Sequence, residues 1–115
     1  MTNRILGNYL KVHRQKAGLS QLELGRLVGY KHRWVVSRHE RSRTAPPFLI
    51  ALAYQEVFRV PVSAIFTGFH ATVAQVIDQS VGEFEKELRD ESVKGRRAML
   101  IAQKLEWLTK RRNKT

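Results

Sequence analysis

The 115-residue sequence contains no cysteine, which excludes disulfide bonds and thiolate metal sites. Acidic residues are scarce as well: ten Asp and Glu stand against 21 Lys and Arg, a net charge of +11. No apolar run approaches the roughly 20 residues of a membrane span, and no secretory signal is visible at the N-terminus. We therefore expect a cytoplasmic protein, and the positive charge predicts a polyanionic partner, nucleic acid first.

Apolar residues recur at helical spacing, and no segment alternates with the period of a strand, so an all-α fold is predicted. A five-helix domain is expected over residues 1–68 and a C-terminal helical segment over 69–115. The five predicted helices cover 5–16 (capped by Thr2 or Asn3), the segment between Ser20 and Gly29, about 33–41, 48–58, and a last short one ending near Gly68. Their expected inward residues include Leu24, Leu27 and Val28, and then Leu49, Leu52, Ala53 and Val57.

Helix-end signals are clear around the second helix. Ser20 and Glu23 have the capping-box spacing, in which each side chain pairs with the other residue's backbone N–H. Gly18 and Gly29 are expected to end the first and second helices, because glycine readily adopts the left-handed conformation found there.

The C-terminal segment is amphipathic, with oppositely charged halves. Residues 71–91 hold six acidic side chains against two basic ones, and residues 92–115 hold eight basic against one acidic. Two arrangements stay open, an antiparallel hairpin and one long helix. The complementary charges favour the hairpin. The apolar stripe exceeds what is needed to cover the small domain, so residues 71–111 are expected to form a homodimer.

The stretch "GYKHRWVVSRHER" places two valines and a tryptophan among basic residues. Together with the preceding "GLSQLELGRLVGY" and the following "ER…P", it resembles the helix-turn-helix of Cro/CI-type (XRE-like) regulators, over roughly residues 3–67. The resemblance implies a lambda-repressor-like fold, a bacterial or phage origin, and a third helix that reads the major groove. Gly25 takes the close-contact position, Gly29 the turn, and Arg14 and Glu40 a bridging pair. One extra residue in the turn makes Val36 the inward anchor, although Val35 stays open.

The same resemblance implies which residues meet DNA. The expected base-reading residues are Arg33, Trp34, Ser37 and Arg38. The expected backbone contacts are Ser20, Gln21, Lys31, His32, Arg41 and Arg43. Trp34 has an alternative place, over the edge of the core.

The expected function is that of a sequence-specific regulator of transcription, most simply a repressor, which binds an inverted-repeat operator as a dimer. Two alternatives stay open: an antitoxin whose C-terminal helices hold a toxin, and an adaptor or RNA-binding module on the same scaffold. No catalytic constellation, metal-ligand spacing or phosphate-binding loop occurs. Neither an enzyme nor a cofactor is expected.

Overall fold

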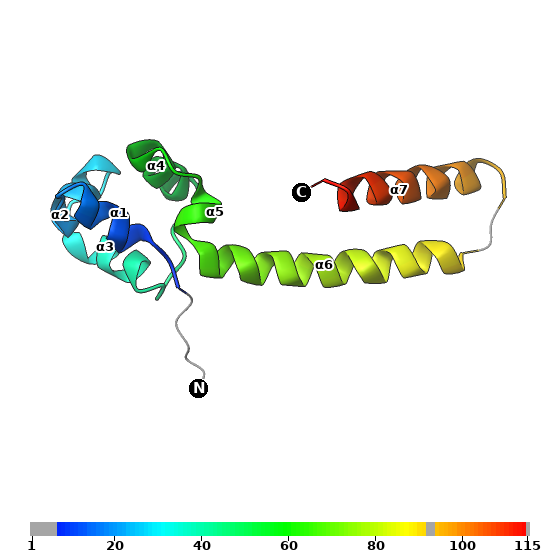
Figure 1. The fold of residues 1–115 in the computed structure, drawn as a ribbon, viewed down its shortest axis with the longest axis horizontal. Helices are drawn as coiled ribbons and strands as arrows, with labels where there is room; N and C mark the ends of the chain where they lie inside the picture. The colour runs from blue at the N-terminus through cyan, green and yellow to red at the C-terminus, as the bar shows by residue number, and fades with distance from the viewer. Residues whose placement is uncertain (1–6, 92–93, 115) are drawn as a thin grey trace, which may run out of the picture. The chain divides into compact units, whose positions relative to one another are not determined.

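The computed structural model describes residues 7–91 and 94–114. These residues form seven helices and no strand, which confirms the all-α prediction (Figure 1). The helices are α1 (Leu10–Lys16), α2 (Gln21–Leu27), α3 (Arg33–Glu40), α4 (Phe48–Phe58), α5 (Val62–Ile65), α6 (Thr67–Asp90) and α7 (Arg96–Arg112). The chain divides into two compact units at residues 73 and 74, within α6. We call these units the N-terminal unit and the hairpin unit.

The first helix begins at Leu10 rather than at residue 5. Asn8 Oδ1 accepts a hydrogen bond from the Leu10 backbone N–H at 3.0 Å. The Tyr9 N–H donates to the Ile65 carbonyl at 2.7 Å, and the Gly68 N–H donates to the Gly7 carbonyl at 2.8 Å. Gly7 and Tyr9 therefore use backbone groups to pair with a distant segment, and the helix does not extend through them. The predicted caps Thr2 and Asn3, and residues 5 and 6 of the predicted helix, lie outside the described residues.

Gly18 and Gly29 end α1 and α2, as predicted, with φ of +75° and +103°. In both cases the residue after the glycine donates its N–H back into the helix: Leu19 to the Arg14 carbonyl at 3.1 Å, and Tyr30 to the Gly25 carbonyl at 2.8 Å. This backbone geometry satisfies carbonyls that a helix end otherwise leaves unpaired. The Ser20–Glu23 capping box is also present at the start of α2.

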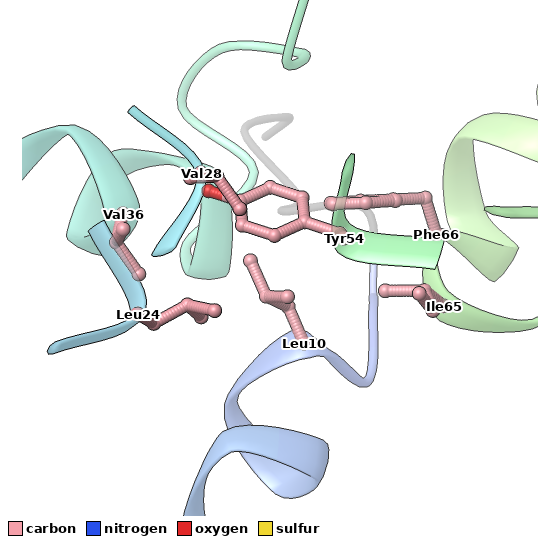
Figure 2. Close-up of a cluster of buried hydrophobic side chains, with 7 residues drawn as sticks. All are labelled: Leu10, Leu24, Val28, Val36, Tyr54, Ile65 and Phe66. Carbon is pink, nitrogen blue, oxygen red and sulfur yellow. The ribbon is translucent and has the colours of Figure 1, made fainter. Parts of the chain in front are cut away.

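The core of the N-terminal unit draws buried side chains from α1 to α5 and from the residues that follow α2 and α5 (Figure 2). Its members are Leu10, Leu24, Val28, Val36, Tyr54, Ile65 and Phe66. Each fully buried aliphatic or aromatic side chain contributes about 1.5–3 kcal/mol relative to exposure. This cluster therefore holds α3 against the other short helices.

Two predicted inward faces are partly wrong. Leu27 is 59% exposed, because it lies about 60° around α2 from the buried Leu24, on the side opposite to the buried Val28. On α4, Leu49 is 72% and Leu52 38% exposed, whereas Ala51 and Tyr54 are buried. The run "FLIALAY" is apolar at nearly every position, so its spacing does not decide which side faces inward. The contact of Tyr54 with α3, described below, rotates α4, so that its buried face is displaced by about one residue from the predicted face.

The hairpin unit is an antiparallel pair, with α7 running back along α6 (Figure 1). Gly95, at φ +74°, precedes α7, while Ser92 and Val93 lie outside the described residues. Leu88, Ile101 and Leu108 are buried along the line of contact between α6 and α7, which we call the seam. Ion pairs join the helices: Arg112 with Glu85, and Arg111 with Asp78 at 3.8 Å. Among the described residues, no helix combines the length and apolarity needed to cross a membrane.

Candidate nucleic-acid interface

α2 and α3 cross closely at Gly25. A Cβ atom at this position would lie 3.2 Å from the His32 carbonyl oxygen and 3.6 Å from Val36 Cγ2. The first distance is tighter than ordinary van der Waals contact with a backbone atom, so a side chain here would push the helices apart. Val36 is fully buried below Gly25, whereas Val35 is only partly buried. Of the two valines left open by the sequence, Val36 therefore points into the core.

The opposite face of α3 carries the residues predicted to read bases. Arg33 and Arg38 are exposed, Trp34 is 56% exposed, and Ser37 is partly exposed. Trp34 therefore does not cover the core. The Arg38 guanidinium carbon lies 5.8 Å from the centroid of the Trp34 ring, within the range of a cation–π contact. This contact restrains a long side chain that would otherwise move freely beside the helix.

Exposed basic side chains surround this face. Lys31 and His32 precede α3, and Arg41 and Arg43 follow it. Arg41 Nε donates to the Ser37 carbonyl at 3.4 Å. Residues 7–73 carry ten Lys and Arg against three Glu, so the field of the N-terminal unit attracts polyanions. Within residues 7–91 and 94–114, no group of three or more His, Asp or Glu side chains is placed to hold a metal ion.

Glu40, at the end of α3, joins three helices. Its carboxylate accepts hydrogen bonds from Arg14 of α1 through Nε and Nη2, and from Gln21 Nε2 of α2 at 3.0 Å. Arg14 also donates to the Leu19 carbonyl at 2.9 Å. The side chains of Arg14 and Glu40 are 11% and 3% exposed, so this is a nearly buried, two-point ion pair. Gln21, predicted to contact the DNA backbone, thus belongs to the network that orients α3. The hydroxyl of Ser20, also predicted there, accepts from the Glu23 N–H.

Three residues that sequence reasoning missed also hold α3. His39 is 2% exposed, and its Nδ1 lies 2.7 Å from the Tyr54 hydroxyl of α4. Burial lowers the pKa of His39 from its ordinary value of 6.5. Asn8 Nδ2 donates to the carbonyls of His39 and Glu40 at 3.0 and 3.2 Å. The spacing of His39 three residues after Val36 was a signal for its inward position, but no local pattern pointed to Asn8.

This arrangement is a helix-turn-helix, in which two short helices meet at a glycine. One face of the second helix is buried against the core, and its opposite face is exposed and basic. In agreement with it, residues 10–65 match a family model described as helix-turn-helix. These residues form a domain of the Cro/CI-type, XRE-like family, which confirms the resemblance noted in the sequence, and the family consists of DNA-binding regulators. Comparisons with curated proteins and with solved structures find no match.

Proposed function

We propose that the protein is a sequence-specific transcriptional repressor, which binds an inverted-repeat operator in double-stranded DNA as a homodimer, with α3 in the major groove. The observation that carries this proposal is the division of α3 into two faces. Val36 and His39 are buried, while Arg33, Trp34 and Arg38 are exposed on the other side. A helix held in this way presents its outer face to base edges.

The exposed residues suit distinct tasks at that face. Arg33 and Arg38 have the forked donors that pair with guanine O6 and N7. Trp34 offers an apolar surface for a thymine methyl or a deoxyribose, and Ser37 a hydroxyl for either base type. Phosphates are bound by the surrounding donors: Ser20, Gln21, Lys31, His32, Arg41 and Arg43. For Gln21, one amide hydrogen serves Glu40, and the second is the one assigned to a phosphate.

Selection from a random pool of duplex DNA tests the proposal. At ~150 mM salt, where non-specific attraction is weak, we expect enrichment of an inverted repeat with half-sites about ten base pairs apart. The enriched sequence, placed across a promoter in a reporter gene, should lower transcription when the protein is expressed. Binding to the pool without enrichment would contradict a base-reading regulator and favour non-specific or RNA binding. No binding at all would favour an adaptor.

Two arginine variants separate base reading from phosphate binding. Arg38→Ala should lose about 1–3 kcal/mol of discrimination at one base pair of the half-site. Arg43→Ala should weaken binding evenly across sequences and reduce the slope of log affinity against log salt by about one. Both are measured by titration against the selected operator and its single-base variants. If the two variants behave alike, the assignment of α3 to the groove is wrong.

A further inference from the structure

The hairpin unit buries fewer apolar side chains than it exposes. Among its described residues, 74–91 and 94–114, only Leu88, Ile101 and Leu108 are buried, with Val81 and Leu105 partly buried. A unit of about 40 residues lies at the lower limit at which one core supports folding without disulfides, metals or oligomerisation. The chain has no cysteine for disulfides. A second apolar surface packed against the hairpin unit would therefore add to its stability.

Four exposed apolar side chains of the hairpin unit lie on one side of its seam, and we call them the apolar face. They are Ile77 and Phe84 on α6, and Leu100 and Trp107 on α7, between 39% and 55% exposed. At about 100° per residue, Ile77 and Phe84 lie about 40° and 60° around α6 from Val81, both in the same sense of rotation. The two on α7 lie about 100° and 120° from Ile101, in the same sense of rotation. In an antiparallel pair, offsets of the same sense fall on the same side of the seam.

We propose that a second copy of this chain packs its apolar face against this one, so that two hairpin units form a four-helix bundle around a twofold axis parallel to the helices. The inference rests on the dimeric regulator proposed above and assigns where the dimer forms. A twofold axis makes the contact self-complementary, since the same four side chains of each copy meet.

The charges of the two helices select the direction of the axis. Residues 74–90 of α6 hold five acidic side chains against two basic ones, and α7 holds six basic against one acidic. With the axis parallel to the helices, each α6 lies beside the partner's α7, so opposite charges meet. With the axis perpendicular to the helices, α6 would lie against α6 and α7 against α7. Like charges at such an interface disfavour that pairing.

The parallel axis also has a consequence for DNA binding. The two α6 helices then run in the same direction, and both chains enter the bundle from residue 74 at the same end. The two N-terminal units are thereby tethered to one end of the dimer. This arrangement suits an inverted repeat, because its two half-sites lie about one helical turn apart.

Sedimentation of the full chain tests the apolar face. We expect the wild type to be dimeric and Phe84→Glu to raise the dimer dissociation constant at least ~100-fold, because it places an unpaired charge in the contact. Met99→Glu is the control: Met99 is 72% exposed and lies about 160° around α7 from Ile101, in the sense opposite to that of Leu100 and Trp107. It should leave the dimer intact. Circular dichroism checks that both variants stay helical. A monomeric wild type, or equal effects of the two variants, would overturn the proposal.

Spin-label distances in the wild-type background test the axis without a disruptive variant. Because the chain has no cysteine, Gln75→Cys and Lys94→Cys each give one label per chain, both at exposed positions near opposite ends of the hairpin unit. The parallel axis predicts that two labels at residue 75 are closer than labels at 75 and 94 in a mixed dimer, by about 10 Å for helices ~25 Å long. The reverse order would refute it.

The failure of this inference differs from the failure of the proposed function. A dimer with the expected label distances that enriches no DNA sequence would refute the regulator and keep the bundle. A monomer that enriches a single half-site would do the opposite. A chain that is monomeric alone but forms a stable complex with a different small protein through the apolar face would overturn the second copy and favour the antitoxin alternative.

Discussion

The hydrogen bond between His39 and Tyr54 is a sensitive test of how α3 is held. The two atoms are 2.7 Å apart, and the side chains are 2% and 0% exposed. Tyr54→Phe removes the hydroxyl and leaves a buried ring nitrogen without its partner. An unsatisfied buried polar group costs about 1–3 kcal/mol, so the free energy of unfolding of the N-terminal unit should fall by that amount. His39→Leu should cost a similar amount, because it leaves the Tyr54 hydroxyl unpaired.

The double variant makes this prediction refutable. Replacing both partners with apolar groups of similar shape is often nearly neutral, so His39→Leu with Tyr54→Phe should be more stable than either single variant. Urea denaturation gives the three free energies, and hydrogen exchange of the α4 amides locates the loss in the N-terminal unit. If the double variant loses the sum of the two single losses, the side chains act independently and the hydrogen bond is not what stabilises α3.

The same pair predicts a pH dependence with a definite sign. Burial lowers the pKa of His39 in the folded chain below 6.5, whereas the unfolded chain binds the proton with an ordinary pKa. The unfolded state therefore binds more protons between these two values. Stability should be full above pH 6.5 and fall as the pH drops toward the folded-state pKa, by at most about 1.4 kcal/mol per pH unit. The double variant should lack this component.

Three further predictions follow from single contacts. Glu40→Ala leaves Arg14 nearly buried without its partner and should cost about 3 kcal/mol of unfolding free energy in urea; a loss below 1 kcal/mol would contradict the network. Gly29→Ala places an alanine where the backbone φ is +103° and should lower the free energy of unfolding by about 1–2 kcal/mol. Gly82→Ala, with open space around it in α6, should raise that free energy by up to about 1 kcal/mol. The same sign for both variants would contradict this reasoning. Trp34→Ala should change the free energy of unfolding by less than about 0.5 kcal/mol. In titrations against single-base operator variants, it should reduce discrimination at the base pair assigned to Arg38 by about 0.5–1 kcal/mol. Unchanged discrimination would contradict a role for the ring in holding Arg38.

Features determined by a few neighbouring residues were predictable from the sequence. The capping box of Ser20 and Glu23 and the left-handed glycines after α1 and α2 depend on local backbone geometry, and the structure has them where the sequence placed them. The all-α fold likewise follows from helical spacing over long segments. The order of these signals was enough to indicate the family that residues 10–65 match.

Most features determined by distant partners were not predictable, and the Arg14–Glu40 pair was expected only from the family resemblance. The start of α1 depends on hydrogen bonds from residues 7–9 to residues 65–68, about 60 positions along the chain. The inward side of α4 depends on Tyr54 meeting His39, and no periodicity in an apolar run encodes that contact. The spacing of His39 from Val36 favoured an inward position, but a histidine is read from sequence as polar, so His39 looked like part of the basic face. Its burial depends on one hydroxyl group of another helix.

These distant contacts explain how so short a helix can present a defined surface to DNA. With eight residues, α3 has too few backbone hydrogen bonds to be stable alone, so its orientation comes from its surroundings. Val36 holds it against α2, Glu40 against α1 and α2, and His39 against α4, while Asn8 binds its last carbonyls. Three of these four anchors are polar and directional, unlike an apolar contact that tolerates rotation. The proposed base reading by Arg33 and Arg38 should therefore depend on these four anchors, and substitutions at them should change specificity as well as stability.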